Sequence, residues 1–225
     1  TNVAGASTLQ YAVYVNFNQD NPEGAPWNNT NEGPMPDDVY SNLKNSSNNP
    51  TGINMTVVGT AFNGVNPYGM NTGNNSGVYP DKVITQTWWL DANTTAMLRI
   101  DGLSIASTFN FTFFASRACT YCDRTTIYTI GSKSASLNAA DNIFNTATIT
   151  NVKPDENGSV LIEIRAGGAS SFAYIGAMVI ESFIGIDGGG VQQGGPANSV
   201  NPGIVSLGGR LTQTGITPAQ SQTNN

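Results

Sequence analysis

The fold class of this chain is decided by A-M-L-R-I-D-G-L-S-I-A-S-T-F-N-F-T-F-F-A-S-R, residues 96–117. In the second half of this stretch, Phe109, Phe111 and Phe113 alternate with polar residues. Side chains on a β-strand point alternately to the two faces of a sheet, so these three phenylalanines belong on a buried face. The stretch therefore predicts two successive strands of a β-sandwich.

Further strands are expected wherever apolar residues recur with this period between turn residues. They are expected over residues 9–17, 53–62, 83–90, 96–100, 109–116, 125–130, 135–138, 146–152, 159–166 and 172–183. Residues 18–52 and 63–80 are rich in Asn, Gly and Pro and are expected to be long loops, with a short helical turn over residues 37–43. This pattern predicts an all-β, antiparallel β-sandwich or jelly roll with long loops.

The expected domain organisation is one β-sandwich over residues 1–184 followed by a Gly-, Gln- and Asn-rich extension over residues 185–225. The composition of the extension is typical of a linker. Two arrangements remain open for it. It docks either on its own domain or on a neighbouring copy of the chain, where it adds a strand to a sheet.

The composition excludes several classes of partner. The net charge is −6, and the 9 Lys and Arg residues are scattered singly, so no basic stripe is present to bind nucleic acid or an anionic membrane. No run approaches the roughly 20 apolar residues of a transmembrane helix. The low charge and the 2 Cys residues close in sequence are typical of a secreted protein, so we expect an extracellular or cell-surface location.

The chain contains 0 His residues, which excludes the Ser-His-Asp and Cys-His arrangements of common hydrolases. A pair of carboxylates could act as in glycosidases. The candidates by residue type are Asp101, Asp123, Asp141, Glu163 and Glu181. None of them belongs to a recognisable pairing motif, so we expect the protein not to be an enzyme.

Cys119 and Cys122 have the C-x-x-C spacing of thiol redox centres and of half a zinc site. No second C-x-x-C and no βαβ pattern accompanies them, so we expect a local disulfide. Calcium is a candidate structural ion, with Asn16, Asp20 and Glu23 as candidate ligands, although no calcium-loop motif is present.

Aromatic residues in the expected loops are candidates for carbohydrate binding. Sugars stack their C–H faces on aromatic rings, while amide and charged side chains bind the hydroxyl groups. The candidate carbohydrate-binding residues are Trp27, Asn28, Tyr68, Arg117 and Tyr121. In addition, Trp88 and Trp89 point to opposite faces of one strand, so one is expected in the core and the other under the long loops or exposed for stacking.

Several phrases of the sequence resemble a known family. They are Y-P-D-K-V (79–83), I-D-G-L (100–103), F-N-F-T-F-F-A-S-R (109–117), S-L-N-A-A-D-N (136–142), V-K-P-D-E-N-G (152–158) and F-A-Y-I-G-A-M-V-I (172–180). Together they resemble the galactose-binding-like β-sandwich modules of secreted bacterial cell-surface and polysaccharide-degrading proteins. The resemblance spans about residues 9–183 and implies a noncatalytic module that binds sugars or serves as an adhesive unit. The C-x-x-C segment and the C-terminal extension depart from it.

Two functions are therefore expected. The first is a secreted, noncatalytic module that binds a carbohydrate or cell-surface polysaccharide, or mediates adhesion, within a larger surface protein. The alternative is a structural subunit of an extracellular assembly, in which residues 185–225 contact the next copy of the chain.

Overall fold

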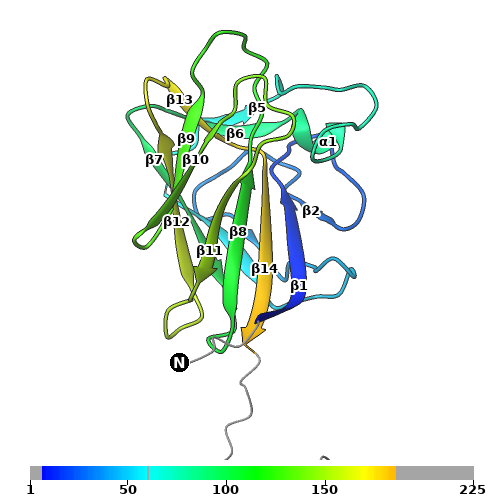
Figure 1. Cartoon of the computed structure of the whole chain (residues 1–225), viewed down its shortest axis with the longest axis vertical. Helices are drawn as coiled ribbons and strands as arrows, with labels where there is room; N and C mark the ends of the chain where they lie inside the picture. The colour runs from blue at the N-terminus through cyan, green and yellow to red at the C-terminus, as the bar shows by residue number, and fades with distance from the viewer. Residues whose placement is uncertain (1–6, 60, 186–225) are drawn as a thin grey trace, which may run out of the picture. The chain divides into compact units, whose positions relative to one another are not determined.

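A computed structural model describes residues 7–59 and 61–185, and nearly all regular structure in them is strand. Two large sheets pack against each other (Figure 1). The first has the order β11 (Ala147–Val152), β8 (Thr108–Phe114), β14 (Ala177–Gly185), β1 (Ser7–Asn16) and β2 (Trp27–Asn29). The second has the order β10 (Lys133–Asn138), β9 (Thr125–Ile130), β12 (Val160–Ala166), β7 (Thr95–Asp101), β4 (Asn54–Val58) and β3 (Val39–Tyr40). The predicted all-β sandwich is confirmed.

A third, smaller sheet consists of β13 (Phe172–Ile175), β6 (Thr87–Asp91) and β5 (Gly64–Asn66). It is joined to the second sheet through Tyr174, whose carbonyl accepts a 2.6 Å hydrogen bond from the Tyr128 hydroxyl. The Tyr174 N–H in turn donates to Thr126 Oγ1 at 2.9 Å. Strands β1 and β2 pair in parallel, whereas the other named strands of the described residues pair antiparallel.

The main core lies between the two large sheets. Phe109, Phe111 and Phe113 of β8 are fully buried, as their alternation predicts. Phe113 stacks on Tyr128 of β9, with the ring centroids 4.3 Å apart and the planes 6° from parallel. Because β8 and β9 belong to different sheets, this contact joins the two layers. Burial of each phenylalanine contributes about 1.5–3 kcal/mol to stability.

A second apolar cluster covers the outer face of the first sheet. Phe114, the last residue of β8, lies on the opposite face of the sheet from Phe109, Phe111 and Phe113, and it is nevertheless fully buried. It packs with Ala177 of β14 and with Val83 and Ile84 of α1 (Asp81–Ile84), the short helix that lies over this face. Four partly buried side chains complete the cluster, namely Trp27, Met70, Tyr79 and Ile143.

The prediction of one strand over residues 83–90 is wrong in its first half. Residues 81–84 form α1, which follows Pro80, a position where the missing proline N–H is not needed. The strand β6 begins only at Thr87. The apolar residues of this segment belong to two different cores, because Val83 and Ile84 join the outer cluster whereas Trp88 and Leu90 join the main core.

The prediction of one long strand over residues 172–183 is also wrong, because the chain changes sheet at Gly176. Strand β13 pairs with β6, and β14 pairs with β8 and β1. A Cβ atom at Gly176 would lie 3.0 Å from Thr87 Cγ2 and 3.1 Å from the Gln86 carbonyl oxygen. The close approach of the two chain segments therefore favours glycine at this crossing.

The helical turn predicted over residues 37–43 is absent. Asp37 and Asn42 have φ values of +64° and +53°, which a right-handed helix does not allow. The segment instead contains β3, which pairs with β4 and forms one edge of the second sheet. The two predicted long loops also contain β2 and β5, which are too short to show a periodic pattern.

The extension over residues 185–225 lies outside the described residues, apart from Gly185, which ends β14. Its docking and the alternative assembly function stay predictions. In the described ranges, no helix is long and apolar enough to cross a membrane.

Candidate ligand-binding site

The loop that joins β8 to β9, residues 115–124, is called the Cys loop here and lies at the top of Figure 1. The predicted Cys119–Cys122 disulfide is confirmed, and it indicates an oxidising compartment. Three backbone N–H groups anchor the loop to its neighbours. That of Arg117 donates to the Ala139 carbonyl at 2.8 Å, that of Ala118 to the Tyr68 carbonyl at 2.8 Å, and that of Cys119 to Asp141 Oδ1 at 2.9 Å.

A pocket of about 150 Å³ opens beside the Cys loop, and we call it the arginine pocket. Its lining residues come from the Cys loop and from all three strands of the small sheet, and they are Asn66, Trp89, Arg117, Arg124, Phe172 and Tyr174. The Trp89 and Phe172 rings form one wall and meet edge to face, with their centroids 5.5 Å apart. Both rings are partly exposed, so they present apolar surface to a ligand.

Both guanidinium groups of the pocket lie over aromatic rings. Arg117 Cζ is 5.1 Å from the centroid of Tyr68, and Arg124 Cζ is 5.3 Å from the centroid of Phe172. These distances are typical of cation–π contacts. In addition, Arg117 donates from Nη1 to the Tyr68 carbonyl at 3.1 Å, and Arg124 donates from Nη1 to the Asp123 carbonyl at 2.8 Å.

Tyr121 stands at the tip of the Cys loop, between the two bonded cysteines, and its side chain is fully exposed. Its φ of +64° lies in the left-handed region, which is unfavourable for a bulky side chain. Tyr68 is 62% exposed on the adjoining loop. Tyr121 thus belongs to the Cys loop, which lines the arginine pocket, and Tyr68 belongs to a loop that contacts Arg117.

The structure brings together three of the five predicted carbohydrate-binding residues. Tyr68, Arg117 and Tyr121 lie on adjoining loops, whereas Trp27 and Asn28 contact other parts of the chain. The Trp27 ring packs edge-on against Tyr14 and Tyr79 in the outer cluster, at centroid distances of 5.3 and 5.1 Å.

Asn28 is occupied by the backbone. Its Nδ2 donates to the Tyr14 carbonyl at 2.9 Å and to the Lys44 carbonyl at 2.8 Å, and its Oδ1 accepts from the Lys44 N–H at 2.8 Å. These bonds join β1, β2 and the segment around residue 44. They give Asn28 a structural role in this structure.

Trp89, Phe172 and Arg124 line the pocket without having been among the predicted site residues. The alternation at Trp88 and Trp89 was the available signal for the first of them, because Trp88 is fully buried and Trp89 is not. No local pattern indicates Phe172, since its position depends on the pairing of β13 with β6.

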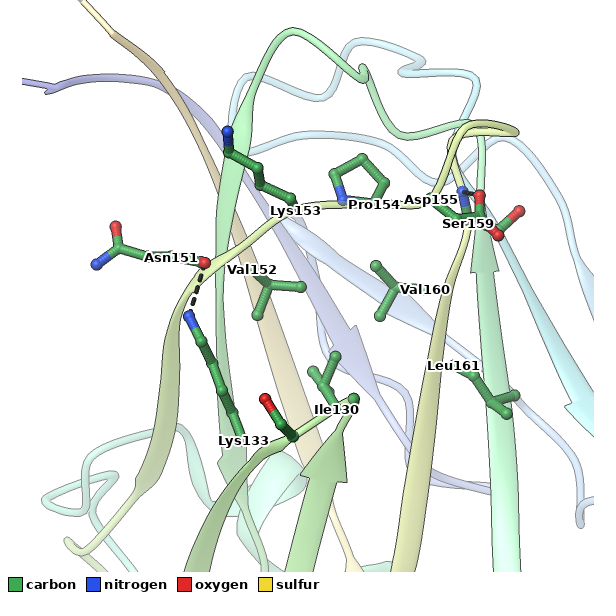
Figure 2. Close-up of a pocket in the computed structure, with 12 residues that line it drawn as sticks. Ile130, Lys133, Asn151, Val152, Lys153, Pro154, Asp155, Ser159, Val160 and Leu161 are labelled. Atoms are coloured by element: carbon green, nitrogen blue, oxygen red, sulfur yellow. Dashed lines mark hydrogen bonds between the residues drawn. The ribbon is translucent and has the colours of Figure 1, made fainter.

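A larger pocket of about 400 Å³ lies between the β9–β10 turn and the loop from β11 to β12 (Figure 2). Most of its polar groups already have partners within the protein. Lys133 Nζ donates to the carbonyls of Thr150 at 2.7 Å and Asn151 at 2.8 Å, and Asp155 Oδ1 accepts from the Asn157 and Ser159 N–H groups. We therefore regard this pocket as a structural seam between the two large sheets rather than as the candidate site.

Calcium binding by Asn16, Asp20 and Glu23 stays a prediction. Asp20 accepts a hydrogen bond from Gln86, and Glu23 accepts one from the Gly24 N–H. Asn16 Nδ2 donates to Asn29, whereas its Oδ1 is buried and has no hydrogen-bond partner within the described residues. Among residues 7–59 and 61–185, no group of three or more His, Cys, Asp or Glu side chains is placed to hold a metal ion.

No protein-family model matches this chain, and a comparison with curated proteins gave no match. The resemblance to galactose-binding-like modules therefore stays a hypothesis about the family. The all-β architecture of packed, mostly antiparallel sheets is established by the structure itself.

Proposed function

We propose that this chain is a noncatalytic carbohydrate-binding module, and that its ligand binds at the arginine pocket and on the exposed rings of Tyr68 and Tyr121. The observation that carries the proposal is the convergence of aromatic rings and guanidinium groups from four separate chain segments at one end of the sandwich. Sugar recognition needs this combination, because a pyranose ring has apolar C–H faces and polar hydroxyl edges.

The size and position of the pocket support this proposal. Its volume of about 150 Å³ is comparable to that of a cavity that holds one benzene ring, so it suits a single sugar unit. Further units of a longer glycan would extend over the loop surface, where Tyr121 and Tyr68 offer additional rings. Loops on a rigid β-scaffold are a common location for such sites.

The hydrogen bonds of three candidate acids, Asp101, Asp123 and Asp141, support a noncatalytic role. Asp101 accepts hydrogen bonds from Arg99 at 2.8 Å and from Ser159 at 2.6 Å, and Asp141 accepts from the Cys119 N–H. Asp123 likewise accepts from two backbone N–H groups. Each of these acids thus has a structural partner, and none lines the arginine pocket. We also propose secretion to a cell surface, because the Cys119–Cys122 disulfide indicates an oxidising compartment.

Retention on immobilised polysaccharides, preceded by a glycan-array screen, tests the proposal. Tyr121→Ala is expected to abolish or strongly reduce retention while leaving the melting temperature unchanged, because its side chain makes no buried contact. Ile105→Ala is the matched control, since Ile105 is 67% exposed on the loop between β7 and β8, at the other end of β8 from the Cys loop. Absence of binding to every glycan on the array, or full retention of Tyr121→Ala, would contradict the proposal.

A further inference from the structure

The arginine pocket holds two positive charges that lack a carboxylate partner. Within the part of the chain that the structure describes, neither Arg117 nor Arg124 forms an ion pair. Each donates one hydrogen bond to a backbone carbonyl, and a guanidinium has several more N–H donors to offer. Such a pair is unexpected in a chain whose net charge is −6.

One of these donors is buried without any partner. Arg124 Nε has no accessible surface and no hydrogen bond in the described structure. Leaving a buried charged donor unsatisfied is unfavourable, and such groups in folded proteins are usually paired with protein, water or a ligand. Because this atom is inaccessible, a ligand in the arginine pocket meets the other N–H groups of Arg124.

The orientation of both guanidinium groups is set before any ligand binds. Arg117 Cζ lies over the Tyr68 ring and Arg124 Cζ over the Phe172 ring, so each group has an aromatic partner. A cation–π contact uses the charge of a guanidinium and leaves most of its N–H groups able to donate. A ligand that accepts from them therefore meets a partly ordered site, which reduces the entropic cost of binding.

The acids near the pocket do not neutralise these charges by direct pairing. Asp123 accepts hydrogen bonds from the Thr125 N–H at 2.8 Å and the Ala169 N–H at 3.0 Å. Asp141 accepts from the Cys119 N–H at 2.9 Å. Both carboxylates are thus held by backbone N–H groups.

We infer that the arginine pocket selects an acidic sugar, and that Arg117 and Arg124 bind a carboxylate carried by the pyranose ring. This inference rests on the carbohydrate-binding function proposed above. A planar carboxylate matches two parallel guanidinium N–H groups, and such bonds are stronger than those to neutral hydroxyls. The adjoining wall of Trp89 and Phe172 takes the apolar face of the same ring.

Calorimetric titration with matched pairs of oligosaccharides tests the inference. Oligogalacturonides and oligoglucuronides are compared with their own methyl esters, which keep the sugar and remove only the charge. At least one acidic oligomer is expected to bind roughly tenfold or more tightly than its ester, because a hydrogen bond to a charged group is worth more than a neutral one. Titration at about 0.15 M salt screens charges beyond about 8 Å, so the preference reports on direct contacts.

Two variants locate the charge preference. Arg117→Gln removes one guanidinium, and Arg124→Lys keeps the charge but loses the planar pair of N–H donors; both are expected to reduce the preference at least severalfold. Arg165→Gln is the control, since Arg165 is exposed and outside the pocket lining. Thermal melting of each variant verifies folding.

The outcomes separate the two proposals. Equal affinity for acid and ester, binding to neutral glycans alone, or a preference that survives both variants would overturn the acidic-sugar inference and leave the binding function standing. Failure of the wild-type chain to bind any acidic or neutral glycan would overturn both.

Discussion

Replacement of Trp27 by alanine is expected to destabilise the protein and to leave carbohydrate binding intact. The Trp27 ring is partly buried and packs edge-on against Tyr14 at 5.3 Å and Tyr79 at 5.1 Å. Replacing a fully buried Trp or Phe by Ala costs about 3–5 kcal/mol. Because Trp27 keeps part of its surface in water, we expect a loss of about 2 kcal/mol, at the low end of core substitutions. In a domain of this size that loss lowers the melting temperature by roughly 4–8 °C.

The assay compares urea unfolding and glycan retention for Trp27→Ala and Tyr121→Ala. The two variants are expected to behave in opposite ways. Tyr121 is fully exposed, so its removal is expected to change stability by no more than about 0.5 kcal/mol while retention is lost. Unchanged stability of Trp27→Ala together with loss of retention would refute the reasoning, because it would mean that the Trp27 ring contacts ligand rather than the outer cluster.

Three further predictions concern the Cys loop and the change of sheet. Replacing Cys119 and Cys122 by serine is expected to weaken glycan retention, because Tyr121 is no longer held at the tip. The stability loss should stay below the approximately 3 kcal/mol of a 15-residue loop, since the closed ring is much shorter, and urea unfolding separates the two effects. Hydrogen bonds from Thr125, then from Ala169, lower the pKa of Asp123, so its ionised form stabilises the loop above about pH 4. That contribution is lost as the pH falls through the folded-state pKa, and Asp123→Asn is expected to flatten the acid limb of a melting-temperature profile; identical profiles would contradict this. Gly176→Ala is expected to cost about 1–3 kcal/mol through its 3.0 Å contact, and a neutral result in urea unfolding would show that the crossing can relax.

Strand positions were predictable wherever an alternating pattern was long. The strand expected over residues 125–130 is observed as Thr125–Ile130, and Phe109, Phe111 and Phe113 occupy the buried face that their spacing predicts. Short edge strands such as β2 and β3 were missed, because two or three residues contain too little of the period.

The strand predictions over residues 83–90 and 172–183 were wrong because one apolar run packs in two different parts of the structure. Residues 172–183 read as a single strand, yet Gly176 divides the run between two sheets. Val83 and Ile84 are predicted to lie in a strand. They lie instead in α1, where they pack against Phe114. In both segments the residue types were apolar as expected, but their partners are distant in the sequence.

The candidate site was predictable only as a set of residue types. Tyr68, Arg117 and Tyr121 were identified as loop residues suited to sugar binding, and the structure places them on adjoining loops. Trp27 and Asn28 have the same residue types and loop context, and the structure gives them packing and hydrogen-bonding partners elsewhere. Chemical type alone did not separate these two groups.

By itself the amino-acid sequence determined the strand-rich class, the buried face of β8 and the local disulfide, because alternation and close spacing act over a few neighbouring residues. Only the tertiary structure decided that Phe172 meets Trp89 and that Arg117 meets Tyr68. Those meetings depend on strand pairings and loop contacts between distant parts of the chain, whose free energy comes from burying a shared core and is absent from any short segment.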